Sequence, residues 1–402
     1  MTADDGAGPL SGIVVIDAGQ VVAGPSIATF LGDFGATVIK VERPGDGDSF
    51  RTFGADRDGV PLGWKFWGRN KKSVTLDLRV PEGQAVLRRL VEKSDVLIES
   101  FRPGTMESWG LSYEALAEIR PELVMVRVSG YGQTGPYSER PGFGSVAEAM
   151  SGFSDMTGFP GGPPVMPPMT LADCVAGLYG AYGVAISLYN RQARSGRGQC
   201  IDISLLEPLA SLLGPHFVIF DQLARLPQRD GNRGRFSAPR NTFITADDRW
   251  ISIAGSTQST ARRLFEAMDR PELIEDARFA TNRARLANVE ELEELITAWT
   301  TTWNLNELYE RLVQFDVPAG PIWNVGDLMS NPQMVAREAI VAVDDEELGP
   351  IRMPNVVPRL SDTPGRILHA GPPLGSSTDV VYRDFLGMTE SELSHLREQG
   401  VV

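Results

Sequence analysis

One carboxylate stands out in the sequence because it heads an apolar, glycine-rich segment and has no basic residue nearby. Asp173 lies near the start of LADCVAGLYGAYGVAISLYN, which follows two prolines and precedes RQARSG. An aspartate at a helix start commonly caps the helix by accepting hydrogen bonds from first-turn N–H groups. A carboxylate at the positive end of a helix dipole also stays ionised and can act as a nucleophile. The segment itself leaves both roles open.

Other residue types that commonly carry catalysis are few. The only cysteines, Cys174 and Cys200, lack metal-ligand spacing, and we expect both to be reduced core residues. The three histidines, His216, His369 and His395, form no recognisable triad or zinc motif. We therefore expect neither a metal cofactor nor Cys–His chemistry.

Basic side chains recur near the ends of predicted strands. They are Arg43, Arg69, Lys71, Lys72, Arg79 and Arg102. Doubly wound folds bind ligands outside the carboxyl ends of their strands, so the recurrence favours an anion site at that edge. Solvated surface charge is the simpler interpretation of any one of these residues alone.

A nicotinamide dinucleotide site is a weaker alternative for the same edge. The turn DAGQVVAGP carries Gly19 and Gly24 before a predicted helix, and Glu42 ends the second predicted strand, where an acid could bind a ribose. The glycine spacing does not match G-x-G-x-x-G, which disfavours this interpretation.

The elements that must hold these residues follow from an alternation over the first 130 residues. Strands are predicted at GIVVIDA, ATVIKVE, SVTLDL, DVLIESF and LVMVRVSGYG, and helices at 25–34, PEGQAVLRRLVEKS and SYEALAEI. Alternating strands and helices form βαβ units around a mainly parallel sheet. We predict an α/β fold with a Rossmann-like, doubly wound large domain over 1–221.

A second, smaller domain is predicted after a polar, Arg- and Gly-rich connection at 222–240. NTFITADDRWISIAG indicates a hairpin, and NVEELEELITAWTT and NLNELYERLVQFD indicate amphipathic helices. These patterns predict an α+β domain over 222–324. The segment 325–402 is expected to return to the large domain, with an irregular Pro-rich stretch over 353–373.

Composition excludes several partners. The chain has 402 residues, a formal net charge of −14 and a pI near 4.8, so its surface as a whole attracts neither nucleic acid nor anionic lipid. The start, MTADDGAGPLSG, lacks a signal-peptide pattern, and no run of 18 apolar residues occurs. We expect a cytoplasmic protein with neither a nucleic-acid nor a membrane partner.

Taken together, the motifs resemble those of the class III CoA-transferases. These include carnitine, formyl/oxalate and dicarboxylate CoA-transferases and the related acyl-CoA racemases. The matching segments are LGDFGATVIKVERPGDGD, GRNKKSVTLDLRVPEG, DVLIESFRPGTMESWGLSYEAL, SGYGQTGPYSERPGFGSVAEAMSG and LADCVAGLYGAYGVAISLYNRQARSGRGQCIDISLLE, with APRNTFITADDRWISIA and DVPAGPIWNVGDLMSNPQ in the second domain.

The resemblance implies a fold, a ligand and a mechanism. Its subunits are rings, interlocked in a homodimer, and the Rossmann-like domain binds coenzyme A. The family nucleophile matches Asp173, which attacks the donor thioester and then carries CoA as an aspartyl-CoA thioester until an acceptor carboxylate takes it.

The resemblance also implies a set of CoA contacts near the predicted strand ends. The matching positions are Val21, Val22, Arg43, Leu76, Arg79, Ser100, Phe101, Arg102, Ser129 and Tyr131. Among these, Arg43 would lie near the 3′-phosphate, Leu76 and Arg79 by the adenine, and Ser129 and Tyr131 nearer the thioester. Family members often have Asn where Ser100 stands, and some have Lys where Ser129 stands.

Two departures from the family pattern bear on the reaction. The racemases carry a catalytic histidine where this chain has Phe143, which removes one of the two bases that α-proton exchange needs. The formyl/oxalate enzymes carry consecutive glycines where this chain has DGNRGRFSAPRNT, a substrate loop containing Gly231, Arg233, Gly234 and Arg235. A formyl or oxalyl substrate is therefore disfavoured.

These observations predict an enzyme that moves CoA from an acyl-CoA to a free carboxylic acid. The alternatives are an α-methylacyl-CoA racemase and an inactive CoA-binding relative. Arg233, Arg235 and Arg240 could accept a second carboxylate, which points to dicarboxylates such as succinate, although arginines in a loop are equally compatible with solvated surface.

Overall fold

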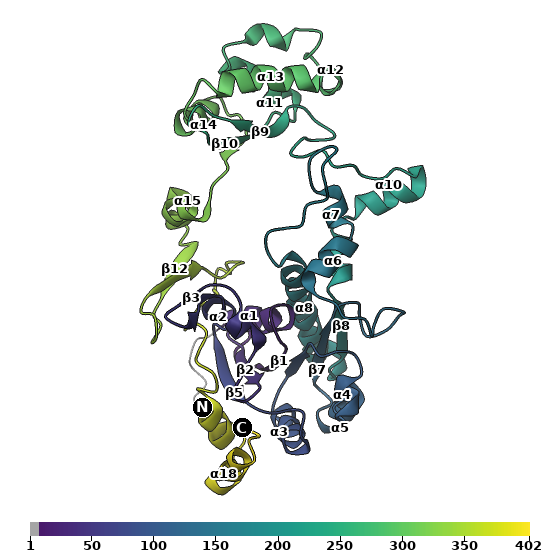
Figure 1. Cartoon of the computed structure of the whole chain (residues 1–402), viewed down its shortest axis with the longest axis vertical. Coiled ribbons are helices and arrows are strands. Elements are labelled where there is room, and N and C mark those ends of the chain that lie inside the picture. Colours follow the sequence, from purple (N-terminus) through teal and green to yellow (C-terminus); the bar gives the residue numbers. More distant parts are fainter. Residues whose placement is uncertain (1–7) are drawn as a thin grey trace. The chain divides into compact units, whose positions relative to one another are not determined.

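The computed structural model describes residues 8–402 (Figure 1). The first seven residues of MTADDGAGPLSG, on which the signal-peptide expectation rests, lie outside this range. Contacts divide the chain into two compact units, each described here by itself. The first comprises the described residues up to Phe153, then Met166–Ala224 and Val335–Val402, and the second comprises Ser154–Val165 and Arg225–Met334.

The second unit includes a segment, Ser154–Val165, that the sequence division assigns to the large domain. Two contacts explain its position: the Arg229 guanidinium bonds to Asp155, and the Gly231 N–H donates to the Gly158 carbonyl at 2.8 Å. The division into 1–221, 222–324 and 325–402 stays a prediction about domains.

The first unit is a mixed α/β structure built on a parallel six-stranded sheet, in the order β5-β2-β1-β6-β7-β8. The strands are β1 (Val14–Ala18), β2 (Thr37–Glu42), β5 (Lys71–Thr75), β6 (Val96–Glu99), β7 (Val124–Ser129) and β8 (Cys200–Ser204). Counted along the chain among themselves, they run 3-2-1-4-5-6, the order of doubly wound dinucleotide-binding sheets. The five predicted strands are confirmed; the edge strand β8 was not predicted.

Separate apolar cores cover the two faces of this sheet, because successive strand side chains point to opposite faces. On one face, Ile16 and Leu97 pack with α3 (Pro81–Glu92) and α5 (Tyr113–Ile119). On the other, Val15 and Ile98 pack with α1 (Ala23–Asp33) and α8 (Leu171–Asn190). The near-continuous apolar strands predicted from the sequence are explained by this double burial.

Glycines let α8 lie close against α1. A Cβ at Gly177 would lie 2.0 Å from the Ser26 hydroxyl, and one at Gly180 would lie 2.3 Å from Ile27. Gly183 is different, since its added Cβ would only reach ordinary contact with Ile201 at 3.5 Å. Two glycines therefore set the position of the helix that carries Asp173.

Helix α8 with the π turn that follows it, Leu171–Ser195, is long and apolar enough to cross a membrane by those two measures, with a mean hydropathy of 1.4. This measure averages hydropathy over a window, so it differs from the uninterrupted run of 18 apolar residues that the sequence lacks. Buried core helices pass the same test, and 44% of this window is buried.

The last residues of the chain complete the core that contains Ile16. Tyr382 is fully buried there and donates its hydroxyl to the Thr75 carbonyl at 2.8 Å, while Leu393 and Leu396 of α18 (Glu390–Glu398) join the same cluster. The preceding Pro-rich stretch is irregular, and its Pro372 carbonyl accepts the Trp64 indole N–H at 2.8 Å.

The second unit is α+β, and its predicted hairpin and helices are confirmed. Strands β9 (Arg240–Ile244), β10 (Trp250–Ala254) and β11 (Ala319–Pro321) form an antiparallel sheet. Its core joins Phe243 and Ile251 to α13 (Val289–Thr300) and α14 (Leu305–Gln314).

The remaining α-helices and strands of the whole chain are β3 (Asp56–Arg57), β4 (Val60–Pro61), α2 (Leu62–Trp67), α4 (Thr105–Ser108), α6 (Gly144–Met150), α7 (Phe153–Met156), α9 (Leu206–Ser211), α10 (Pro215–Leu223), α11 (Gln258–Ala267), α12 (Asn282–Ala287), α15 (Val325–Ser330), α16 (Pro332–Ala336), β12 (Ile340–Val343), β13 (Ile351–Pro354) and α17 (Thr378–Val380).

Candidate functional site

The residues matched to CoA contacts gather at one edge of the parallel sheet. They follow β1, β2, β5 and β6 or lie at and after the end of β7, and the carboxyl ends of parallel strands meet at one edge. That edge is where doubly wound sheets bind their ligands.

The loop from β1 to α1 is tied to the loop after β6. The Gln20 N–H donates to the Ser100 hydroxyl at 2.8 Å. Val22 is buried, with 1% of the residue's surface exposed. Leu76 is likewise buried in the core, so neither residue presents exposed surface for its predicted contact with CoA.

Two exposed arginines, Arg43 and Arg79, interact electrostatically with the acidic residues Asp46 and Asp77. Arg43 pairs with Asp46 at 3.1 Å, and the Arg79 guanidinium donates two hydrogen bonds to Asp77. The Arg43 charge also lowers the pKa of Asp77, after the larger effect of Arg79. Both guanidinium groups are half exposed, and exposed pairs of this kind are weak enough to be exchanged for a phosphate.

The later strand ends add aromatic and hydroxyl groups. The Phe101 ring packs edge-on against Trp109, and Arg102 beside it is exposed. Ser129 accepts a hydrogen bond from the Gly132 N–H at 2.9 Å, and the Tyr131 ring packs edge-on against Tyr137.

Two of the basic residues assigned to an anion site have other partners. Arg69 is buried and binds both carboxylate oxygens of Asp33, at 3.0 and 2.7 Å. Lys71 is fully buried and pairs with Asp17 at 2.8 Å. The predicted roles of Arg69 and Lys71 as phosphate ligands, or as solvated surface charge, are therefore wrong, since buried carboxylates already hold them.

Asp173 is not a helix cap. Helix α8 begins at Leu171, its N-cap is Thr170, and Asp173 is the third helical residue. Its carboxylate lies in the first turn, where the helix dipole favours an anion. No lysine, arginine or histidine within residues 8–402 forms an ion pair with Asp173, and this includes Arg43, Arg102 and Arg240. The oxygens of the Asp173 carboxylate are therefore available to an electrophile.

A second carboxylate lies beside Asp173. Glu148 of α6 is buried and accepts a hydrogen bond from the Ala172 N–H at 3.1 Å. Burial first, and then the charge of Glu148, raise the pKa of Asp173 to about 6. A raised pKa means a more basic carboxylate and hence a stronger nucleophile once ionised.

On the expectation that Asp173 is the nucleophile, the reaction rate should fall as the pH drops below about 6, because only an ionised carboxylate attacks. Glu148→Gln removes the neighbouring negative charge, so the acidic limb of the kcat profile should move to lower pH. The exposed Glu82→Gln change is the matched control and should leave the profile in place. An unmoved limb in the Glu148 variant would show that this charge does not act on the titrating group.

Gly144 at the start of α6 leaves room for the Asp173 carboxylate. A Cβ on Gly144 would lie only 2.0 Å from the Asp173 Oδ2 atom. Phe143, the N-cap of this helix, is 65% exposed and carries no titratable group beside the carboxylate. Neither Gly144 nor Glu148 was predicted from the sequence to belong to the site. Glu148 could have been noticed, because it is the one acidic residue among the small and apolar residues of GSVAEAM.

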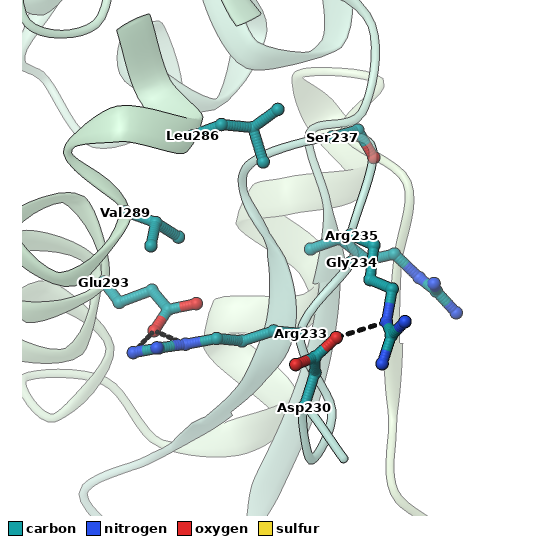
Figure 2. Close-up of a pocket in the computed structure, with 9 residues that line it drawn as sticks. Asp230, Arg233, Gly234, Arg235, Ser237, Leu286, Val289 and Glu293 are labelled. Atoms are coloured by element: carbon teal, nitrogen blue, oxygen red, sulfur yellow. Dashed lines mark hydrogen bonds and ion pairs between the residues drawn. The ribbon is translucent and has the colours of Figure 1, made fainter. Parts of the chain in front are cut away.

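The arginines of the predicted substrate loop line a cavity of about 240 Å³ within the second unit. Figure 2 shows Arg233 directed toward Glu293 and Arg235 toward Asp230. Arg233 binds Glu293 at 2.7 Å, and Arg235 pairs with Asp230.

Arg240 differs from the other two arginines of this cavity. It is exposed, and among the described residues no carboxylate forms an ion pair with it. Its carbonyl accepts the Gly234 N–H at 3.0 Å, which joins it to the substrate loop. Arg240 is thus the arginine of this cavity that is available to a ligand carboxylate.

Metal-ligating residues do not gather elsewhere in the part of the chain that the structure describes, where no group of three or more His, Cys, Asp or Glu side chains could hold an ion. Both cysteines are free. The prediction that both are core residues is wrong: Cys174 is only half-buried, and Cys200 is exposed on the edge strand β8.

Comparisons with known proteins identify the family. The model of CoA-transferase family III matches residues 10–378. The chain is 43% identical to the succinyl-CoA–D-citramalate CoA-transferase of Chloroflexus aurantiacus, over 98% of both chains, and 42% identical to the succinyl-CoA–L-malate CoA-transferase beta subunit of that organism, again over 98% of both.

A solved structure shows the same fold. It is a CAIB/BAIF family protein from Brucella suis, with a TM-score of 0.86, 34% identity, and coverage of 94% of this chain and 99% of that one. The family match spans both units, and the relatives match the chain nearly end to end. The chain belongs to CoA-transferase family III.

Proposed function

We propose that the protein transfers CoA from an acyl-CoA to a free carboxylic acid through an aspartyl-CoA thioester at Asp173. The observation that carries the proposal is the Asp173 carboxylate itself, which lies in the first turn of α8, has a raised pKa and forms no ion pair among the described residues. Such a group is a suitable covalent nucleophile for acyl exchange.

The steps balance without an external base. The Asp173 carboxylate attacks the donor thioester carbonyl, which gives a mixed anhydride and releases CoA as a thiolate. The thiolate attacks the aspartyl carbonyl and expels the donor acid as its carboxylate, leaving aspartyl-CoA. The acceptor carboxylate then takes CoA by the same two steps in reverse, and Asp173 is restored.

We place CoA along the carboxyl edge of the sheet. The basic groups there suit its two phosphate regions, with Arg43 and Arg79 exposed on one side of the edge and Arg102 after β6. Arg43 is the proposed partner of the 3′-phosphate. Ser129 and Tyr131, at and after the end of β7, are proposed to lie nearer the thioester.

Dicarboxylates are the proposed acids. The two curated relatives are named for succinyl-CoA with D-citramalate or L-malate, and all of these acids carry a second carboxylate. Within the second unit, the cavity that contains Arg240 offers a carboxylate one unpaired guanidinium and the hydroxyl of Ser237. Guanidinium groups bind carboxylates with two parallel hydrogen bonds, which would distinguish a dicarboxylate from a monocarboxylate.

Arg240→Ala is expected to lower kcat/KM for succinate as acceptor by about 10- to 100-fold, the effect of losing a charge-assisted hydrogen bond, and to leave butyrate nearly unchanged. Initial rates with both acids on the same acyl-CoA measure the ratio. Arg262→Ala on α11, an exposed arginine of the same unit, is the control. Equal losses for succinate and butyrate would remove Arg240 from acceptor recognition.

A racemase is less well supported. Exchange of an α-proton needs one base on each side of the carbon, and Phe143 stands where the racemases carry histidine. An inactive CoA-binding relative is disfavoured because the nucleophile is in place. Incubation with succinyl-CoA followed by intact-mass measurement tests the proposal: a CoA adduct that a dicarboxylate removes is expected, whereas loss of α-deuterium without an adduct would favour the racemase.

A homodimer is proposed because α8 presents an apolar stripe. Leu178, Tyr182, Ile186 and Tyr189 recur at helical spacing, and each is between 46% and 69% exposed. An exposed stripe of large apolar side chains is typical of an interface. A second copy of this chain is the proposed partner, in agreement with the resemblance, and cytoplasmic location stays a prediction.

A further inference from the structure

Two lysines are buried beneath the edge at which we place CoA. Lys40 of β2 and Lys71 of β5 are each at most 1% exposed. Lysine is almost never fully buried unless it is paired, because removing its charge from water is costly. The residues that pair with Lys40 and Lys71 therefore indicate the role of these two buried charges.

Lys71 fixes the sheet to the first turn of α1. Its Nζ donates to the Asp17 carboxylate at 2.8 Å and to the Pro25 carbonyl at 2.7 Å. Lys40 shares Asp17 with Lys71 and also contacts Asp48 and the loop between β1 and α1. Its Nζ lies 2.8 Å from Asp48 Oδ2 and 3.7 Å from Asp17, and it donates to the Gly19 carbonyl.

Asp48 extends this network into the loop itself. Its Oδ1 accepts the Val21 N–H at 3.0 Å and the Phe50 N–H at 2.9 Å. Burial opposes the charges on the pair. The carboxylates outweigh burial and raise the pKa of Lys40, while Lys40 and the hydrogen bonds outweigh it and lower the pKa of Asp48. Both groups are thus charged at neutral pH.

The residue that Asp48 holds has an unfavourable backbone conformation. Val21 has a φ of +65°, in the left-handed region. A β-branched residue there is strained and keeps the conformation only when its surroundings enforce it. Strain of this kind tends to occur at functional sites, where it fixes a loop in its binding geometry.

We propose that the buried Lys40–Asp48 pair is a positioning device that holds Val21 in this conformation and so presents the β1–α1 loop to CoA. The proposal rests on the proposed function, because it assigns a role within that CoA site. Neither residue needs to touch the ligand. Their effect should appear in the affinity for acyl-CoA and much less in the chemical steps at Asp173.

The test compares Asp48→Ala, Val21→Gly and the double variant with the wild type. Glycine adopts positive φ without strain, so Val21→Gly should make Asp48 less necessary. We expect Asp48→Ala to raise KM for acyl-CoA by about 10- to 100-fold with kcat within about threefold, as for a misplaced binding group. In the Val21→Gly background the same change should raise KM by only a few fold.

Asp33→Asn is the matched control, since Asp33 is as buried as Asp48 and pairs with Arg69 at the other end of α1. It should lower thermal stability without changing KM. Asp48→Asn, which keeps the size and the Oδ1 acceptor, replaces Asp48→Ala if that variant does not fold, and we expect a smaller rise in KM.

The outcomes separate this proposal from the proposed function. Unchanged KM in a folded Asp48 variant, or an equal rise with and without Val21→Gly, would overturn the positioning role. Isothermal titration of the wild type with free CoA tests the function separately. Absence of binding there would overturn the CoA site and the positioning role together.

Discussion

Asp173→Asn should give a folded protein that binds CoA but whose transfer rate has fallen by about 10⁴-fold or more, the loss typical of a removed nucleophile. Asparagine keeps the size of the side chain and an oxygen acceptor, so a purely structural role would survive the change. It cannot form the mixed anhydride or the aspartyl-CoA thioester. The expected difference between the two roles is therefore very large.

The thermal stability of the Asp173→Asn variant should change in the opposite direction to its activity. The folded state raises the pKa of Asp173 from 3.8 to about 6, so it binds a proton more tightly than the unfolded chain. Stability is therefore lost as the pH rises from about 3.8 to about 6, and the full penalty remains at pH 7. Asparagine removes this penalty, and we expect its melting temperature at pH 7 to equal or exceed that of the wild type. Circular dichroism, intact mass after acyl-CoA treatment, and rates decide the question: a folded variant that still turns over would exclude Asp173 as nucleophile.

Gly144→Ala is expected to lower kcat by about 100-fold or more, the effect of moving a reacting group by roughly 1 Å. The new Cβ would lie 2.0 Å from Asp173 Oδ2, so the carboxylate must turn away. The backbone at Gly144 is not in the left-handed region, so the collision with Asp173 is the cause. Binding of free CoA should remain, because the proposed phosphate contacts lie elsewhere on the sheet edge.

Gly183→Ala provides the control for Gly144→Ala. Its Cβ would meet Ile201 at an ordinary 3.5 Å, and alanine is favoured over glycine within a helix. We expect unchanged kcat and a gain in unfolding free energy of up to about 1 kcal/mol. Wild-type kcat in a folded Gly144→Ala protein would contradict the crowding of Asp173 at this position.

The strands, and the edge at which their carboxyl ends meet, could be predicted because they depend on local patterns. Apolar runs such as GIVVIDA form the buried strand β1, and residues that follow parallel strands must meet at one edge. The position of Asp173 at the start of a helix could be predicted from the prolines before it. Its exact place could not, because a helix boundary shifts by one or two residues and Thr170 is the N-cap.

Burial of charge could not be predicted from the sequence. Arg69 and Lys71 are basic residues near a predicted strand, as phosphate ligands commonly are. In the structure, however, Arg69 pairs with Asp33, 36 residues earlier, and Lys71 pairs with Asp17, 54 residues earlier. The same limit explains why Glu148 and Gly144 were missed, since their proximity to Asp173 depends on how α6 packs against α8. Residues that lie far apart in the sequence cannot be identified as a pair from their residue types alone.

The participation of the C-terminal residues in the core around Ile16 has a consequence for biosynthesis. Until a ribosome has added the residues from Tyr382 to Leu396, one face of an otherwise complete parallel sheet has no Tyr382, Leu393 or Leu396 against it. The inserted second unit has its own core and is free to fold earlier. The nascent chain is therefore exposed to aggregation and chaperone capture until these residues are added, and truncations that remove them will act on folding of the parallel sheet itself.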